Sequence, residues 1–150
     1  MRSTYQKRGY FGIGIYQPKT TENMGTLWRS AYLIGADFIF TIGHRYKHQP
    51  TDTLKSTRHV PLFNFPDWEV FKKSIPESAE IVIIEQGGEL LQTFNHPQQA
   101  VYVLGSEDKG IPPELLRGNR VAEIESTRVS SYNVAVAGSI VLHDRLVKCL

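Results

Sequence analysis

The stretch Val121 to Asp144, VAEIESTRVSSYNVAVAGSIVLHD, joins a short apolar-alternating segment, a polar loop and a run of small apolar residues. Ser131 and Asn133 lie at the end of the loop, and such side chains accept hydrogen bonds from the free N–H groups at a helix start. We therefore expect a helix from Asn133 to about Lys148. Its first half carries almost no polar side chain, so it must be buried on most sides. A polar loop held by a deeply buried helix is suited to a rigid binding site.

Strands and helices alternate along the rest of the chain. Strands are expected at 11–16, 37–42, 80–85, 100–104 and 121–124, with a shorter extended piece at 60–63. Helices are expected from Met24 to about Ile34 with Asn23 as the cap, at 67–73, from Pro112 onward and after Asn133, with a helical turn at 89–93. This alternation predicts an α/β fold with a mostly parallel sheet flanked by helices.

Composition limits the class of protein. The length of 150 residues fits a single domain spanning 1–150, and 41% hydrophobic with 21% charged residues is typical of a globular chain. The net charge of +2 is too small to indicate a nucleic-acid partner, so a basic surface would have to be local. Cys149 is the single cysteine, which excludes an internal disulfide and any Cys/His metal spacing. With no signal peptide or membrane span in the sequence, we expect a cytoplasmic protein.

Three polar loops follow predicted strands, at 23–29, 105–110 and 126–133. In an open α/β sheet, ligands bind beyond the carboxyl ends of the strands. Each loop taken alone has an ordinary interpretation: the one from Gly105 to Gly110 as a turn, Asn23 as a helix cap, and Glu107 as a surface carboxylate. Arg29 is either a solvated helix residue or a planar cation that grips a phosphate. The order and joint placement of the three loops favour a shared site.

Three segments carry a family resemblance. They are Asn23-x-Gly25-x-x-x-Arg29, Leu104-Gly105-Ser106-Glu107-x-x-Gly110 and Ser131-Tyr132-Asn133-Val134-Ala135-Val136-Ala137. In this order they resemble the three motifs of the SpoU (TrmH-like) branch of the SPOUT RNA methyltransferases. The sequence departs from the family pattern at Tyr132, where leucine is usual, and at Glu125, where proline usually follows the isoleucine. Both departures fall in the loop that is expected to surround the cofactor.

The resemblance implies a concrete activity. The family transfers a methyl group from S-adenosylmethionine to a ribose 2′-hydroxyl of tRNA or rRNA. It works as homodimers with the site completed across the interface, and its C-terminal region forms a deep trefoil knot. The matching catalytic positions are Arg29, Asn23, Glu107, Ser131 and Asn133, and the matching cofactor positions are Leu104, Gly105, Gly110, Ile124, Tyr132 and Val134. Because a guanidinium is almost never deprotonated in proteins, we expect Arg29 to grip a phosphate rather than act as a base.

Basic residues near the N-terminus and after the second strand are candidates for RNA contacts, chiefly Arg8, Arg45 and Lys47. A solvated charged loop is the plain alternative. A catalytically weak or inactive RNA-binding protein on the same fold is a second interpretation of the whole chain. A nucleotide-binding enzyme of the ordinary kind would need a glycine-rich turn after the first strand, and Gln17-Pro18-Lys19 does not supply one.

Overall fold

A computed structural model describes residues 9–43 and 59–149. These residues form one six-stranded sheet in the order β3-β2-β1-β5-β4-β6, in which every pair is parallel. The strands are β1 (Tyr10–Tyr16), β2 (Phe38–Ile42), β3 (Leu62–Phe65), β4 (Glu80–Leu90), β5 (Gln99–Leu104) and β6 (Arg120–Glu123). The predicted α/β class with a parallel sheet is confirmed.

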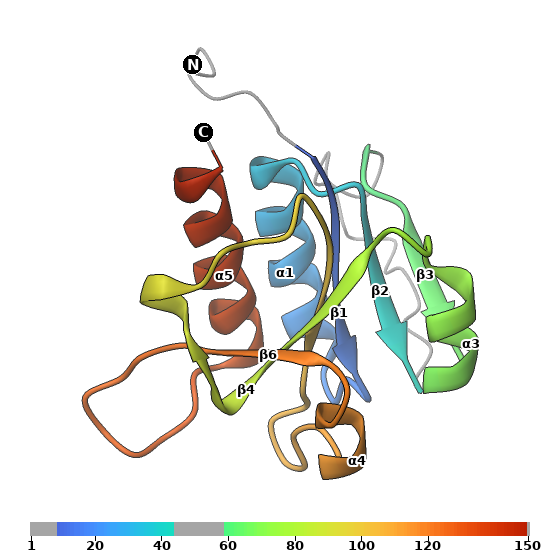
Figure 1. Ribbon diagram of the computed structural model, residues 1–150. Coiled ribbons are helices and arrows are strands. Elements are labelled where there is room, and N and C mark those ends of the chain that lie inside the picture. Colours follow the sequence, from blue (N-terminus) through green and yellow to red (C-terminus); the bar gives the residue numbers. More distant parts are fainter. Residues whose placement is uncertain (1–8, 44–58, 150) are drawn as a thin grey trace.

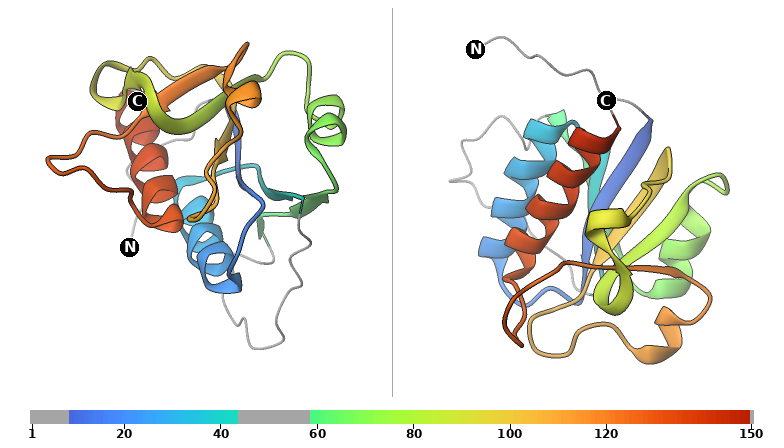
Figure 2. Two further views of the ribbon diagram at one scale, coloured as in Figure 1. Left: turned by 90° about the horizontal axis from the view of Figure 1, so that it is seen from below. Right: turned by 60° about the vertical axis from the view of Figure 1, so that its left-hand side comes forward.

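Two layers of helices cover the sheet. The long helices α1 (Thr21–Ile34) and α5 (Val134–Lys148) lie side by side on one face (Figure 1), as the turned views also show (Figure 2). The shorter α3 (Trp68–Ser74) and α4 (Pro113–Leu116) contribute Phe71 and Leu115 to the hydrophobic cluster on the other face. A 3-10 turn, η1 (Leu91–Thr93), links β4 to β5. No helix in the described part of the chain has the length and apolar character needed to span a bilayer.

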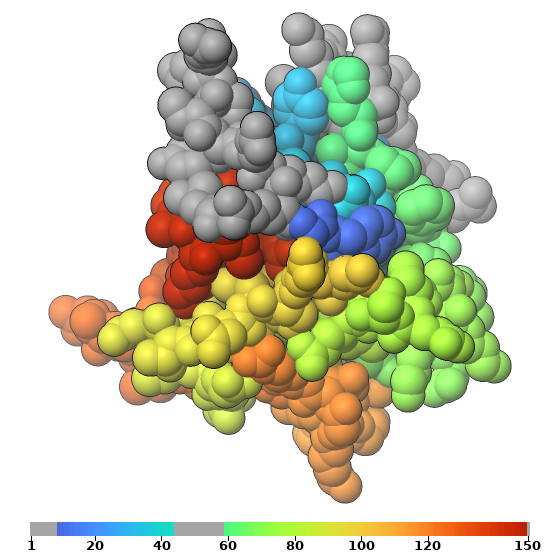
Figure 3. Space-filling model, turned by 45° about the horizontal axis from the view of Figure 1, so that its top comes forward, coloured from blue at the N-terminus to red at the C-terminus, as the bar shows by residue number. Residues whose placement is uncertain are grey.

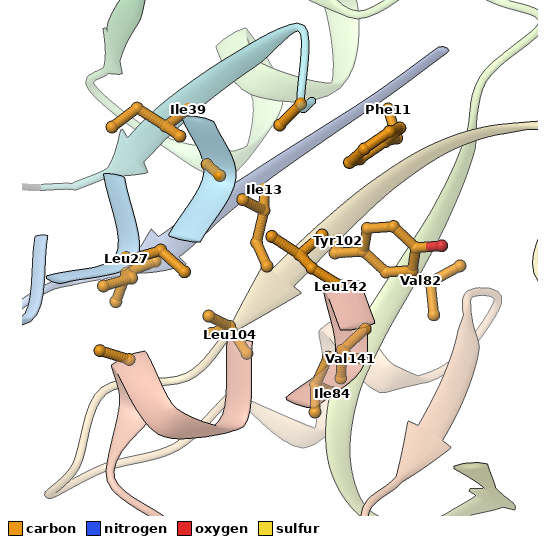
Figure 4. Packing of buried hydrophobic residues seen from close by; sticks show 14 of the residues in the cluster. Phe11, Ile13, Leu27, Ile39, Val82, Ile84, Tyr102, Leu104, Val141 and Leu142 are labelled. Atoms are coloured by element: carbon orange, nitrogen blue, oxygen red, sulfur yellow. The ribbon is translucent and has the colours of Figure 1, made fainter. Parts of the chain in front are cut away.

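The core between the sheet and the two long helices contains buried aliphatic side chains and Tyr102 (Figure 4). Gly138 of α5 is packed so closely that a Cβ there would lie 2.5 Å from Leu27 Cδ1 and 3.0 Å from Leu104 Cδ1. Glycine at this position thus allows α5 to approach α1 and β5 together. The hydroxyl groups of Ser30 and Ser139 join the two helices at 2.7 Å. The start of α5, which lies at the edge of the site, is therefore rigidly placed.

The predicted cap of the first helix is wrong. Thr20 is the N-cap, and its hydroxyl oxygen lies 3.5 Å from the backbone nitrogen of Asn23. Threonine and asparagine both serve as caps, so the sequence pattern alone does not choose between them. The consequence is functional, because Asn23 lies in the first turn of α1 and its side chain is available to the site.

Other predicted boundaries differ from the structure at β3 and β4. β3 lies two residues later than expected, at Leu62–Phe65. β4 continues to Leu90 through a register shift against β6, so the helical turn predicted from Glu89 begins at Leu91 instead. The Asn133 cap of α5 is confirmed. The predicted burial of the first half of α5 is only partly correct, since Val136 is 46% exposed.

Candidate functional site

A pocket of about 600 Å³ opens at the carboxyl ends of β5 and β6, beside the middle of β4. Its walls are the segments 84–86, 104–110, 123–124 and 126–132, with Val134 and Ala137 of α5. In Figure 1 the arrows of β1 and β2 point toward the side of the sheet where α4 and the connection between β6 and α5 lie. The carboxyl edge of a parallel sheet is the place where ligands bind in α/β proteins.

All the residues predicted to hold the cofactor line this one pocket: Leu104, Gly105, Gly110, Ile124, Tyr132 and Val134. Leu104 and Val134 are buried apolar residues, whereas most of the loop 126–132 is polar and exposed. Tyr132 lines the pocket and is 40% exposed. A concave site with an apolar floor and polar loops suits a small amphipathic molecule.

The two glycines of the 105–110 loop fix the shape of that loop. The Gly110 N–H donates to the Ser106 carbonyl at 3.0 Å, and the two residues form an isolated bridge. Gly110 has a φ of 60°, which favours glycine. A Cβ on Gly105 would lie 2.9 Å from the Gly110 Cα. Both glycines are therefore required by the fold of the loop itself.

Three side chains from distant segments meet at the edge of the site. Asn23 Nδ2 donates to Glu107 Oε1, across 84 positions of the chain. Asn133 Nδ2 donates to Asn23 Oδ1 at 3.1 Å and to Glu107 Oε1 at 3.4 Å. We call Asn23, Glu107 and Asn133 the amide–carboxylate cluster. It joins the first turn of α1, the 105–110 loop and the start of α5.

The orientation of the Asn133 amide is fixed by its role as a helix cap. Asn133 Oδ1 accepts hydrogen bonds from the backbone N–H groups of Ala135 at 3.0 Å and Val136 at 3.2 Å. The NH₂ group must then face the cluster, because only an oxygen can accept these two bonds. The same residue thus caps α5 and orients Glu107.

An ion pair between Lys19 and Asp108 adds a second link between the β1–α1 connection and the 105–110 loop. The hydrogen bond that Lys19 donates to Asp108, followed by the negative charge of that carboxylate, raises the pKa of Lys19. Both side chains are more than half exposed, so the pair contributes little to stability. Its effect is to hold the loop that carries Glu107.

The remaining predicted catalytic residues stand apart from this cluster. Ser131 is exposed and lines the pocket. Arg29 is exposed on α1, nearly two turns beyond Asn23. Its side chain has no hydrogen-bond partner within residues 9–43 and 59–149. It does not line the pocket. The predicted RNA contacts Arg8, Arg45 and Lys47 lie outside the described residues.

Glu85 is a pocket residue that the sequence analysis missed. Its Oε1 accepts from the Gln86 N–H at 2.9 Å and its Oε2 from the Ile111 N–H at 3.3 Å. The carboxylate thus joins the middle of β4 to the segment after the 105–110 loop. A charged residue at the end of the predicted strand 80–85 was the available signal, but it is equally typical of a strand that reaches solvent.

Solved structures share this architecture. The chain is 21% identical to the protein of a study titled "Structural insights into the 2-OH methylation of C/U34 on tRNA", with a TM-score of 0.83 over 94% of this chain and 97% of that one. It is 23% identical to an AdoMet-bound rRNA methyltransferase from Sinorhizobium meliloti, with a TM-score of 0.74 over 93% of this chain but only 57% of that one. It is 19% identical to the A. aeolicus TrmH/SpoU tRNA modifying enzyme, with a TM-score of 0.80 over 96% and 77%. At these identities the likeness shows the fold alone.

Sequence comparison supplies the family. No curated protein gives a match to the chain. The sequence profile of the SpoU rRNA Methylase family matches residues 11–143, a range that runs from β1 into α5 and includes all three motifs. Since the match covers most of the chain, this protein belongs to the SpoU rRNA methylase family.

Proposed function

We propose that this chain transfers a methyl group from S-adenosylmethionine to a ribose 2′-hydroxyl of tRNA or rRNA. The observation that carries the proposal is the amide–carboxylate cluster, which lies at the edge of a pocket lined by every residue predicted to bind the cofactor. Similar structures support the cofactor, since one from Sinorhizobium meliloti and the AviRb enzyme from Streptomyces viridochromogenes are described with AdoMet. A third similar structure, described as giving insight into the 2-OH methylation of C/U34 on tRNA, supports the ribose target.

The pocket fits such a cofactor in size and chemistry. Its volume of about 600 Å³ is in the range of small-molecule sites. Leu104, Ile124 and Val134 offer apolar surface, and the loops at 105–110 and 126–132 offer polar backbone and side-chain groups. When bound, S-adenosylmethionine supplies a methyl group on a sulfonium, whose carbon accepts the attack of an oxygen.

The residues of the chain would position the ribose and receive its hydrogen bond. Glu107 is held by two amide donors, so its carboxylate has a fixed orientation at the edge of the pocket. It would accept a hydrogen bond from the ribose hydroxyl and take up its proton as the oxygen–carbon bond forms and the carbon–sulfur bond of the sulfonium breaks. Arg29 would grip the neighbouring phosphate, and such positioning supplies much of the rate of a two-substrate reaction.

A homodimer is the assembly we propose. Leu33 of α1 is 72% exposed, and Val136 and Val147 of α5 are about half exposed. Val136 and Val147 line a shallow groove of about 550 Å³, together with other α5 residues, Thr26 and Leu91. Exposed apolar surface of this kind is typical of a protein interface. The distance of Arg29 from the cluster within one chain fits a site that a second protomer completes.

Three further expectations follow from the resemblance and the composition. We propose that residues 1–150 form one domain, that the C-terminal region from β4 to α5 is knotted, and that the protein works in the cytoplasm. The close packing of α5 against α1 and β5 is compatible with a tightly threaded C-terminal segment.

The decisive experiment is transfer of a tritiated methyl group from S-adenosylmethionine to total tRNA and to rRNA. Replacing Arg29 with alanine should lower the rate by about a hundredfold or more, because an anchor for the phosphate is lost. The affinity for S-adenosylhomocysteine, measured by calorimetry, should stay unchanged. Arg117→Ala, at another exposed arginine, is the matched control. Full activity in Arg29→Ala would remove this residue from the mechanism.

Wild-type protein that binds RNA but neither methylates it nor binds S-adenosylhomocysteine would favour the catalytically inactive alternative. If the wild-type protein is active, mass spectrometry of RNA nucleosides with and without it would identify the methylated nucleotide.

Reversing the charges of Arg45 and Lys47 should weaken RNA binding and reduce its dependence on salt. An unchanged salt dependence would exclude that basic segment from the contact.

A further inference from the structure

The loop that spans residues 125–132 joins β6 to α5 and forms one wall of the pocket. The two positions at which this chain departs from the family pattern, Glu125 and Tyr132, are its first and last residues. The Tyr132 hydroxyl donates a hydrogen bond to the Glu125 carbonyl at 2.6 Å. The two departures are thus in direct contact, and together they close the loop at its base.

The base of the loop has a second attachment, to a different element. Glu125 Oε2 accepts a hydrogen bond from the backbone N–H of Gln92 at 2.8 Å. Gln92 lies in η1, which follows β4, so this bond joins the loop to the main body of the fold. Within the loop, the Ser126 hydroxyl donates to the Arg128 carbonyl at 2.8 Å. Glu125 therefore uses its backbone toward Tyr132 and its side chain toward η1.

Hydrogen bonds hold the conformation of this loop, because side-chain packing contributes little to it. Every residue from Ser126 to Tyr132 is exposed, and Val129 is fully so. Without buried side chains, a loop of this length samples many conformations. A ligand that binds only one of them has a lower affinity, because binding must order the loop and reduces its conformational entropy. A bond that joins the two ends of the loop removes part of that cost in advance.

We propose that Tyr132 and Glu125 form a clasp that holds the 125–132 loop in its cofactor-binding shape. Tyr132 is then a positioning residue that acts through the loop, and its hydroxyl has no need to touch the cofactor. The leucine that is usual at this position cannot make the bond. The consequence for binding rests on the proposed function, whereas the consequence for the loop itself does not.

The first test measures the loop without any cofactor. Trypsin cleaves after Arg128, in the middle of the loop, only when that segment can leave its folded shape. Tyr132→Phe keeps the ring and removes the hydroxyl, so cleavage after Arg128 should become about fivefold faster, as expected for the loss of one hydrogen bond. Tyr16→Phe, which removes a half-buried phenol outside the pocket, should cleave at the wild-type rate. An unchanged rate in Tyr132→Phe would overturn the clasp.

The second test measures binding. In Tyr132→Phe the Kd for S-adenosylhomocysteine should rise about fivefold. The KM for S-adenosylmethionine should rise with it, and the loss should fall on KM rather than on kcat, because the clasp acts before chemistry. Tyr132→Leu should behave like Tyr132→Phe. If only the leucine variant loses affinity, the ring itself contacts the ligand and the clasp is refuted.

The two tests separate the clasp from the proposed function. If wild-type protein fails to bind S-adenosylhomocysteine while Tyr132→Phe still exposes Arg128 to trypsin, the proposed function fails and the clasp stands. Glu125→Ala, which removes only the side-chain bond to Gln92, should also accelerate cleavage after Arg128. If cleavage in Glu125→Ala is no faster than in wild type, the loop is held by the Tyr132 hydrogen bond and not by the bond to Gln92.

Discussion

The two ends of α5 carry polar networks of opposite character. At its start, Asn133 belongs to the amide–carboxylate cluster, whose members are exposed or half-buried. Near its end, Arg145 is only 2% exposed and makes its bonds inside the protein. One helix thus connects an open network at the site with a closed network at the opposite edge of the sheet.

The closed network is centred on Arg145. Its guanidinium donates to the carbonyls of Pro97 at 2.6 Å and Gln98 at 2.9 Å, and to the Tyr102 hydroxyl at 3.0 Å. It also lies over the Phe11 ring, 4.5 Å from the ring centroid. Figure 3 shows the yellow segment that includes residues 91–99 beside the red C-terminal helix. Arg145 therefore ties this segment to α5.

His96 extends the closed network on the same edge. Its Nδ1 lies 2.7 Å from the Tyr102 hydroxyl and its Nε2 lies 2.6 Å from Asp144 Oδ2, while Lys148 reaches the same carboxylate at 2.9 Å. Burial lowers the pKa of His96 and raises the pKa of Tyr102 to about 12. Both groups are therefore neutral at physiological pH.

The comparison shows how one fold divides its polar groups between stability and binding. Buried groups must satisfy each other, since an unpaired buried polar atom is costly. No buried side-chain nitrogen or oxygen within the described residues lacks a partner. Groups at the site are left near solvent, where a ligand can replace water as their partner. Three substitutions test this division.

The largest effect on stability is expected for Arg145→Met. The change leaves the Pro97 carbonyl without its donor and takes one of two partners from the Gln98 carbonyl and the Tyr102 hydroxyl, which keep the Tyr10 N–H and His96. The free energy of unfolding should therefore fall by about 3 kcal/mol or more. Urea unfolding followed by circular dichroism measures it. Arg117→Met, at an exposed arginine, should stay within about 0.5 kcal/mol of wild type. A similar small change at Arg145 would show that the closed network is not what stabilises this edge.

A functional effect without a stability effect is expected for Asn133→Asp. Aspartate still accepts from the N–H groups of Ala135 and Val136, so the cap survives and stability should change by less than about 1 kcal/mol. The NH₂ donor to Asn23 and Glu107 is lost, and a second carboxylate faces Glu107. Methyl transfer should therefore fall by about tenfold or more. Equal activity in this variant would remove the cluster from the mechanism.

The smallest effect is a pH dependence of stability that arises from His96. Because its pKa is lower in the folded protein, the unfolded chain takes up a proton first as the pH falls below about 6.5. The stabilisation is complete above that pH and is lost as the pH falls through the folded pKa. The surrounding charges are Asp144, which opposes the shift, and Arg145 and Lys148, which add to it.

Urea unfolding at a series of pH values from 8 to 5.5 measures this dependence. His96→Gln, which keeps polar atoms for Tyr102 and Asp144, should show a shallower loss of stability than wild type. If both proteins lose stability equally over that range, another group is responsible.

Sequence patterns predicted most of the fold because they report on near neighbours. Continuous apolar runs gave the buried strands, and alternation with helices gave the parallel sheet. The cofactor candidates share a pocket because each follows, or lies beside, a strand that ends at the same edge. The error at Asn23 has a local cause, since two polar residues three positions apart, Thr20 and Asn23, could each cap the helix.

By itself, then, the sequence determined the order of elements, the capping of α5 and many of the residues that line the pocket, although not Glu85. Only the tertiary structure decided that Asn23 meets Glu107, that Tyr132 reaches the Glu125 carbonyl, and that Arg145 is a buried cation. In the sequence, Arg145 is an ordinary basic residue in the last turn of a helix. Local patterns encode which way a residue faces, whereas the partner it finds depends on how distant segments pack against one another.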